Sequence, residues 1–173
     1  NISGVFFSGG DQRILTEILL GTKLLDRIKE IYFSGGVIAG TSAGAAIMSK
    51  IMITGDELKA DSTSRVFSII EKGNIKITEG FGFLDNCIID QHFIKRKRHN
   101  RLISIVLENP ELIGIGIDES TAILVDDRSQ FEIIGESQVI VFDATNSTIK
   151  TNNNGLQSGT DIKMYLLFNG DKF

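Results

Sequence analysis

Short apolar runs that alternate with helical segments constrain the fold of this chain more than any other feature. Each run has the length of a strand buried in a sheet. They are Val5–Phe7, Val37–Ala39, Cys87–Asp90 and Ile113–Ile117. Apolar residues at helical spacing predict helices that end before Gly21, run from the capping residue Thr22 to Tyr32, and span Ala43–Lys50 and Lys95–Leu107. This order predicts an α/β fold, with a mainly parallel sheet flanked by helices.

The C-terminal third has a different pattern, because short strands joined by turns replace the strand–helix order. The strands are Thr121–Val125, Phe131–Ile134, Val139–Phe142 and Met164–Phe168, with a turn at Asp126-Asp127-Arg128. They predict an antiparallel extension of the sheet. Between Thr54 and Gly73 the periodicity fades, which predicts a loop-rich segment with one short helix. Residues 1–173 contain no repeat or linker, so a single domain is expected.

Composition argues against several classes of function. The net charge of −4 argues against nucleic-acid binding, since such domains usually carry a basic excess. One cysteine excludes an internal disulfide framework and supplies too few thiolates for a structural zinc site. That residue, Cys87, lies in an apolar run and is expected to be a buried hydrophobe rather than a reactive thiol.

The ends and the hydropathy of the chain bear on its location. No run approaches the roughly 18 apolar residues of a membrane span, and no signal peptide opens the chain. We therefore expect a cytoplasmic protein with no membrane partner. The chain begins at Asn1 without an initiator Met and enters a strand almost at once. This start predicts that upstream sequence is missing, so that residues 1–173 are an N-terminally incomplete catalytic domain.

A serine stands in the turn between a predicted strand and a predicted helix. The turn is Gly40-Thr41-Ser42-Ala43-Gly44, and Ala45 and Ala46 follow it. A nucleophilic serine in such a strained turn needs small neighbours, and the helix N-terminus supplies free N–H groups, with that of Ala43 well placed to hold an oxyanion. The alternative is a small-residue helix cap in which Ser42 is a spacer.

A serine nucleophile needs a base, and the chain offers only His92 and His99. His92 follows the strand Cys87–Asp90 and is expected at the carboxyl edge of the sheet, near Ser42. His99 lies in a basic segment, where a solvated position is the better interpretation. Asp118-Glu119 follows the strand Ile113–Ile117 at the same edge and can supply a carboxylate. The order of serine, histidine and carboxylate differs from that of α/β-hydrolases, which argues against an ordinary lipase or esterase.

Several segments together resemble the cyanophycinases, in the family of serine peptidases that also contains the α-aspartyl dipeptidases. Their order along the chain is what makes the resemblance specific. They are Phe7-Ser8-Gly9-Gly10-Asp11-Gln12, Gly40-Thr41-Ser42-Ala43-Gly44-Ala45-Ala46, Asp90-Gln91-His92-Phe93 with Arg96, Arg98 and Arg101, Gly116-Ile117-Asp118-Glu119-Ser120-Thr121-Ala122, and Ile162-Lys163-Met164-Tyr165-Leu166-Leu167 with Gly170 and Phe173. The resemblance implies a fold like that of class I glutamine amidotransferases, with serine in place of their cysteine. Family members carry further βα units ahead of the first motif, and these are absent here.

The resemblance also implies a reaction. The substrate would be cyanophycin, a poly-aspartate chain bearing arginine on each β-carboxyl group, and the products β-aspartyl-arginine dipeptides. Ser42 would be the nucleophile, His92 the base and Glu119 its orienting acid, with the Gly10 and Ala43 N–H groups holding the oxyanion. This acyl transfer needs no metal or cofactor. A homodimer is what the family suggests.

Substrate-side positions carried over by the resemblance are Gln12, Asp90, Gln91, Arg96, Arg98 and Arg101. Arginines suit a dense row of carboxylates because the planar guanidinium donates two parallel hydrogen bonds. Arg98 and Arg101, three apart, would share one helix face. A solvated basic face is the alternative for this segment, and a loop-capping carboxylate is the alternative for Asp90. A nucleic-acid patch is disfavoured by the acidic total.

Three other functions stay open from the sequence. A related dipeptidase would prefer short peptides with N-terminal aspartate. Another β-aspartyl or γ-glutamyl amide could be the substrate. A binding module without activity would need a broken triad, whereas Ser42, His92 and Glu119 are all present.

Overall fold

The computed structural model describes residues 2–59, 67–127 and 129–173. The first half contains, in chain order, β1 (Gly4–Phe7), α1 (Gln12–Leu19), α2 (Lys23–Phe33), β2 (Val37–Gly40), α3 (Ala43–Ala46), β3 (Ile51–Glu57), β4 (Ile75–Glu79) and β5 (Cys87–Gln91). The second half contains α4 (His99–Glu108), β6 (Ile113–Ile117), β7 (Thr121–Val125), β8 (Phe131–Gly135), β9 (Val139–Asp143), β10 (Thr148–Thr151), β11 (Gln157–Thr160) and β12 (Lys163–Leu167).

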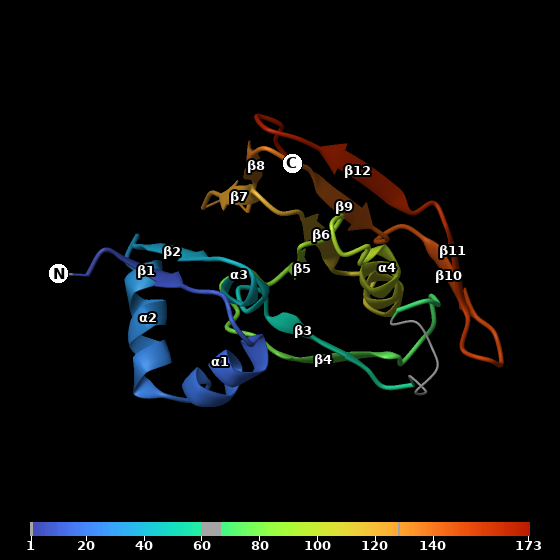
Figure 1. Ribbon diagram of the computed structural model, residues 1–173, viewed down its shortest axis with the longest axis horizontal. Helices are drawn as coiled ribbons and strands as arrows, with labels where there is room; N and C mark the ends of the chain where they lie inside the picture. Colours follow the sequence, from blue (N-terminus) through green and yellow to red (C-terminus); the bar gives the residue numbers. More distant parts are fainter. Residues whose placement is uncertain (1, 60–66, 128) are drawn as a thin grey trace.

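Local capping explains where the first helices begin. The Asp11 carboxylate accepts a hydrogen bond from Arg13 N–H at the start of α1, 2.9 Å away. The predicted cap Thr22 accepts one from Leu25 N–H at the start of α2. Both helices connect β1 to β2, which pair in parallel (Figure 1). The predicted βαβ opening of the chain is therefore confirmed.

The strands form several small sheets. The largest has four strands in the order β12-β9-β6-β5, in which only β5 and β6 run parallel. Among the described residues the other parallel pair is β1–β2, and β3–β4, β7–β8 and β10–β11 are antiparallel pairs. The structure is thus mixed α/β with an antiparallel C-terminal part, but the strands do not form the single, mainly parallel sheet that the sequence suggested. The short connection between β7 and β8 is one reason, because a tight hairpin pairs its strands antiparallel, whereas parallel strands need a crossover of about a dozen residues or more.

Two helix predictions are corrected. The helix predicted over Ala43–Lys50 ends at Ala46, a turn follows at Ile47 and Met48, and strand β3 begins at Ile51. The helix stops because the carbonyl oxygens of Ile47 and Met48 accept hydrogen bonds from residues 81–84 instead of from the next helical turn. Helix α4 begins at His99 instead of Lys95, because the residues before it form turns in which Arg96 N–H donates to His92 O. Residues 60–66 of the expected loop-rich segment, and Arg128 of the expected turn, lie outside the described residues.

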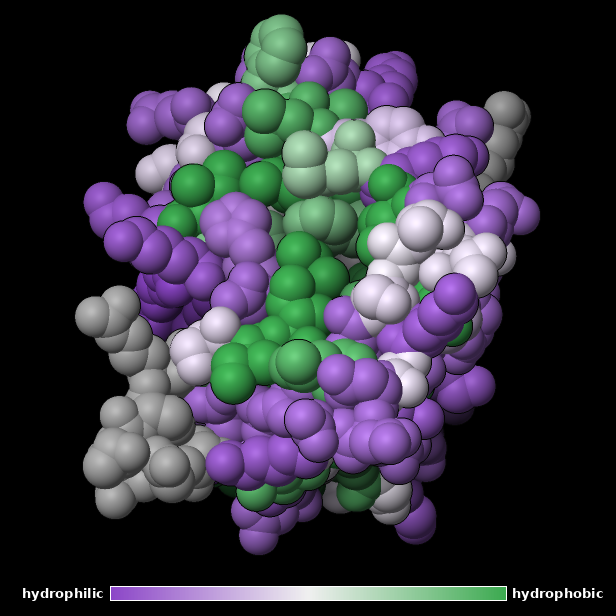
Figure 2. Space-filling view, turned by 90° about the vertical axis from the view of Figure 1, so that its right-hand side faces the viewer, coloured by the Kyte–Doolittle hydropathy of each residue, from purple (hydrophilic) through white to green (hydrophobic). Residues whose placement is uncertain are grey.

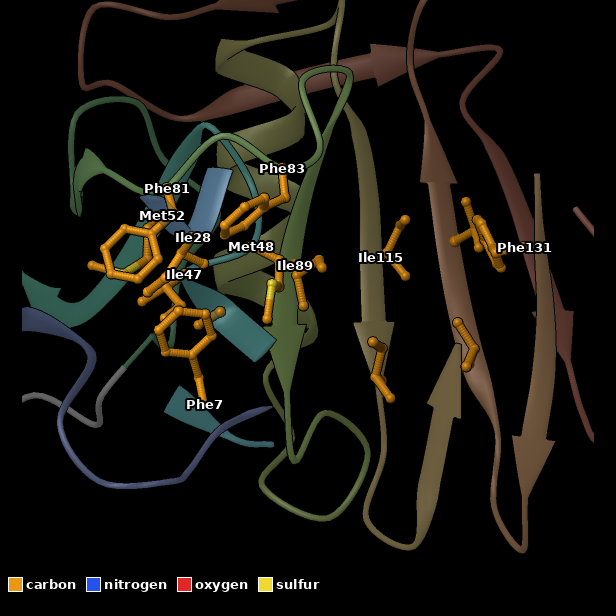
Figure 3. Close-up of a cluster of buried hydrophobic side chains, with 14 of the residues drawn as sticks. Phe7, Ile28, Ile47, Met48, Met52, Phe81, Phe83, Ile89, Ile115 and Phe131 are labelled. Carbon is orange, nitrogen blue, oxygen red and sulfur yellow. The ribbon is translucent and has the colours of Figure 1, made fainter. Parts of the chain in front are cut away.

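An aromatic and aliphatic core fixes the strands that carry the site. Phe7, at the end of β1, packs edge-on against Phe81 with ring centroids 5.3 Å apart, and Phe81 is fully buried (Figure 3). Met48, which follows α3, and Ile89 of β5 belong to the same cluster. The core therefore holds the ends of β1 and β2, helix α3 and strand β5 against one another.

The outer surface is mixed in polarity. Figure 2 shows, on the side of β10–β12, a band of apolar side chains bordered by polar ones. On β12, the alternate residues Met164 and Leu166 are exposed. In the part of the chain that the structure describes, no helix is long and apolar enough to cross a membrane.

Candidate active site

Ser42 occupies a strained turn between β2 and α3. Its backbone has φ 52° and ψ −110°, in the region that non-glycine residues avoid. The turn closes only with glycine on both sides, because a Cβ on Gly40 would lie 2.2 Å from Gly44 O and one on Gly44 would lie 2.1 Å from Phe7 O. The small residues in the sequence motif thus have a steric cause, as the elbow interpretation predicted.

Ser42, His92 and Glu119 form a continuous hydrogen-bonded chain. Ser42 Oγ lies 2.9 Å from His92 Nε2, and His92 Nδ1 lies 3.0 Å from Glu119 Oε1. When the proton is on Nδ1, the Nδ1–H group donates a hydrogen bond to Glu119, and Nε2 is free to accept a hydrogen bond from the serine hydroxyl. The side chain of His92 is 24% exposed and that of Glu119 is 41% exposed, so the chain opens to solvent at the carboxylate.

Strand pairing explains why these residues meet. The last pair between the parallel strands β5 and β6 is Gln91 with Ile117. His92 follows β5 and Asp118-Glu119 follows β6, so these residues lie side by side. Phe93 N–H donates to Ile117 O and locks the two strand ends together. Helix α3, which follows Ser42, packs against β5. Three separate parts of the sequence are thereby brought to one edge.

Two backbone N–H groups belong to residues close to Ser42. Gly9 lies beside the serine, since a Cβ on it would be 3.5 Å from Ser42 Cβ, and Gly10 follows with φ 141°. Ala43 N–H is at the first position of α3. Across residues 2–59, 67–127 and 129–173, the N–H groups of Gly10 and Ala43 have no acceptor. Both donors are therefore available to an oxyanion.

Asp90 and Arg101, predicted on the substrate side, lie in the interior. Their side chains are 1% and 3% exposed, and the Arg101 guanidinium donates two hydrogen bonds to the Asp90 carboxylate. Arg101 also stacks on the Phe67 ring, 5.1 Å from its centroid. In this conformation each group is the other's partner, and neither reaches solvent.

Arg98 links this buried pair to the site. Its guanidinium lies 3.6 Å from Asp90 and donates to the backbone and side-chain oxygens of Gln91, the residue before His92. Burial lowers the pKa of Arg98 to about 10, and the neighbouring Arg101 charge adds to this effect. Arg98 and Arg101 both approach Asp90. They do not share a helix face as predicted, because Arg98 precedes the helix.

The remaining predicted positions differ in their surroundings. Gln12 donates from Nε2 to Ile53 O and Thr54 O, and so joins α1 to β3. Arg96 is exposed. His99, expected to be solvated, is half-buried and lies against the Phe93 ring, with centroids 4.8 Å apart.

Two observations concern thiol chemistry and metal binding. Burial raises the pKa of the Cys87 thiol to about 12, and the nearby Asp85 charge adds to this, as suits a structural cysteine. In the described part of the chain, no three His, Cys, Asp or Glu side chains are grouped so that they could hold a metal ion.

The sequence did not point to Ser137, which contacts the loop that carries Glu119. Its hydroxyl donates to Asp118, and its N–H donates to Thr121 Oγ1. Nothing in the local sequence marks this residue, because its role depends on the return of the β7–β8 hairpin to the end of β6. The sequence indicates Asp118 together with Glu119 as a carboxylate at this strand end, but its hydrogen bonds with Lys95 N–H and Ser137 Oγ depend on long-range packing.

A serine in a strained turn, a histidine at hydrogen-bond distance and a carboxylate on the far side of the imidazole form the arrangement of serine hydrolases. A sequence model of Peptidase family S51 matches residues 1–133. The chain belongs to this family of serine peptidases.

Individual relatives agree with that assignment. The chain is 33% identical to a cyanophycinase of Geminocystis herdmanii, over 99% of this chain and 62% of the relative. It is 34% identical to a cyanophycinase of Trichormus variabilis, over 99% and 56%. The chain thus spans about six tenths of the length of these curated relatives. The crystal structure of a peptidase from an acI-B1 Actinobacterium superposes with a TM-score of 0.66 at 27% identity, covering 99% of this chain and 59% of that one.

Proposed function

We propose that this chain carries the catalytic centre of a serine peptidase that hydrolyses cyanophycin to β-aspartyl-arginine dipeptides. The observation that carries the proposal is the hydrogen-bonded chain from Ser42 through His92 to Glu119. The choice of substrate is supported by the cyanophycinases among the relatives. We also propose a class I glutamine amidotransferase-like arrangement, with the parallel pairs β1–β2 and β5–β6 at its centre.

The reaction is an acyl transfer in two halves. Ser42 Oγ attacks the scissile carbonyl carbon while His92 Nε2 takes the serine proton, and Glu119 stabilises the imidazolium. The N–H groups of Gly10 and Ala43 donate to the oxyanion, each contributing about 3 kcal/mol by analogy with other oxyanion holes. His92 then gives the proton to the leaving amine. In the second half, water attacks the acyl-enzyme with His92 as base, and Ser42 is restored.

The basic residues after His92 suit an Asp/Arg polymer. Arg96 is exposed and offers its whole guanidinium to a carboxylate. The Arg98 side chain is 15% exposed and donates to Gln91, the residue before His92. Asp90, which is paired with Arg101, lies 3.6 Å from Arg98, so we infer that the buried pair contributes to binding through the position of Arg98. Gln12 is half-buried at the start of α1, just after the Gly10 turn.

The test is dipeptide release from purified cyanophycin granules, followed by mass spectrometry. We expect the unmodified chain to release β-aspartyl-arginine and the Ser42→Ala variant to release none. Ser49→Ala is a matched control, because Ser49 is a buried serine just beyond the same short helix and does not reach His92. Release by Ser42→Ala at the unmodified rate would contradict the assignment.

A dipeptidase is the second candidate, and the same assay separates it. The α-aspartyl dipeptidases would cleave short peptides with N-terminal aspartate and leave the granules intact. Cleavage of Asp-x dipeptides without granule hydrolysis would therefore replace cyanophycin as the proposed substrate while keeping Ser42 as the nucleophile.

A further inference from the structure

Asp118 connects the two loops that carry the histidine and the carboxylate of the site. It follows β6 directly, next to Glu119. Its Oδ1 accepts a hydrogen bond from Lys95 N–H at 2.9 Å, and Lys95 belongs to the turn that starts at His92. That turn is rigid in itself, since Arg96 N–H donates to His92 O. One carboxylate thus joins the backbone after His92 to the backbone before Glu119.

The second oxygen of Asp118 is held from the opposite side. Oδ2 accepts a hydrogen bond from Ser137 Oγ at 2.8 Å. Ser137 N–H donates to Thr121 Oγ1, and Thr121 Oγ1 donates to the carbonyl of Glu119. The same network therefore reaches Glu119 from its C-terminal side as well.

Strain in the Glu119 loop explains why such support is needed. Ser120 has φ 55°, and Glu136 N–H donates to Ser120 O. Residues in this backbone region persist only where the surroundings determine them, at about 1–3 kcal/mol each. A loop that is strained and partly exposed would otherwise carry Glu119 away from the imidazole.

The charge of Asp118 is consistent with this role. Burial alone raises the pKa of the carboxyl, but the hydrogen bonds from Lys95 N–H and Ser137 Oγ outweigh it and hold the pKa below its usual value. The group is therefore a carboxylate at neutral pH and can accept both bonds at once.

We propose that Asp118 is a positioning residue that sets the distance between His92 and Glu119 by bridging Lys95 N–H and Ser137 Oγ. The inference rests on the proposed roles of His92 and Glu119, and it extends them to a residue that touches neither Ser42 nor the reacting atoms. Asp118 acts through backbone geometry, whereas Glu119 acts on the imidazole itself.

Asp143 offers a matched control for the variants. It ends β9 at the opposite end of the four-stranded sheet, and its carboxylate also accepts from a backbone N–H and a hydroxyl, both of Thr145. Its pKa is likewise held low by these bonds. Asp118→Ala and Asp143→Ala therefore remove the same two kinds of hydrogen bond, but only in Asp118 do these bonds join distant segments next to the site.

The first experiment measures labelling of Ser42 by a small fluorophosphonate, which needs no knowledge of the substrate. We expect Asp118→Ala to lower the maximal labelling rate by about tenfold or more, with the half-saturating probe concentration unchanged, because a displaced base affects the chemical step. Asp118→Asn should keep most of the rate, since the amide oxygen still accepts from Lys95 N–H. Asp143→Ala should label at the unmodified rate. A normal rate in Asp118→Ala would overturn the inference.

The second experiment reports the hydrogen bond directly. Proton NMR of the unmodified chain should show a downfield signal from His92 Nδ1–H, identified by its loss in Glu119→Gln. We expect Asp118→Ala to weaken or remove this signal and Asp143→Ala to keep it; its persistence in Asp118→Ala would overturn the inference. Absence of labelling in the unmodified chain would instead contradict the proposed function, and the NMR comparison would still decide the role of Asp118.

Discussion

Ser42 and His92 face each other with side-chain atoms 2.9 Å apart, and both hold a left-handed backbone, with φ of 52° and 51°. Each such residue raises the energy of the folded state by about 1–3 kcal/mol. The surroundings hold both strained turns in place. Gly40 and Gly44 allow close packing on the serine side, and the hydrogen bond from Phe93 N–H to Ile117 O fixes the histidine side. The serine hydroxyl and the imidazole thus meet because each is presented by a strained turn.

Replacing His92 should remove most reactivity of the site. We expect His92→Ala to lower fluorophosphonate labelling of Ser42 and hydrolysis of cyanophycin by about 10³-fold or more, because the serine loses its base. His99→Ala is the control, since His99 contacts Phe93 and lies outside the hydrogen-bonded chain. It should keep the activity at a somewhat lower melting temperature. Equal losses in both variants would mean that His92 contributes only to folding.

The turn around Ser42 should not tolerate a methyl group. In Gly44→Ala the new Cβ would lie 2.1 Å from Phe7 O, so the end of β1 must move away from the elbow. We expect a loss of about 3 kcal/mol in the free energy of unfolding, measured by urea denaturation. Gly73→Ala is the comparison, because Gly73 has φ 68° with open space around it and should lose only about 1 kcal/mol. Similar losses would show that space at the elbow is not limiting.

Cys87 should be inert in the folded chain. Its pKa of about 12 leaves the thiol protonated at pH 8, and the thiolate is the reactive form. We expect a disulfide reagent such as Ellman's to react slowly under native conditions and promptly after unfolding in urea. Rapid native labelling at pH 8 would contradict the structural role of this residue.

The extent to which the site could be predicted differs between its parts. The strained turn at Ser42 could be predicted because its requirement for small neighbours is local and concerns five consecutive residues. His92 and Glu119 were found because the carboxyl ends of parallel strands meet at one edge, which holds for β5 and β6. The Asp90–Arg101 pair could not be found, because the sequence shows only a basic segment and burial depends on the packing of α4.

The same reasoning explains the errors in the fold. The helix predicted to reach Lys50 stops at Ala46 because the carbonyl oxygens of Ile47 and Met48 accept hydrogen bonds from residues 81–84, a segment far along the chain. The antiparallel partners of β6 and β9 come from residues far along the chain. Sheet order depends on such long-range contacts, which composition and spacing do not report.

The effect of the buried ion pair Asp90–Arg101 on the free energy of unfolding can be measured with two variants. Arg101→Met leaves a carboxylate that is 1% exposed without its partner, and we expect a loss of about 3–5 kcal/mol in the free energy of unfolding. Asp90→Leu combined with Arg101→Met removes both charges and should recover most of that loss, with Arg98 still bound to Gln91.

An exposed ion pair on α2 is the comparison for the buried pair Asp90–Arg101. Arg27 and Glu30 form an i,i+3 pair with side chains 71% and 62% exposed, so Arg27→Met should change the free energy of unfolding by less than about 0.5 kcal/mol. All three variants can be measured by urea denaturation at pH 7. If Arg101→Met were as mild as Arg27→Met, water would have to reach Asp90 in solution. If the double variant were as unstable as Arg101→Met, the loss would come from packing of the long arginine side chain against Phe67, and not from the unpaired charge.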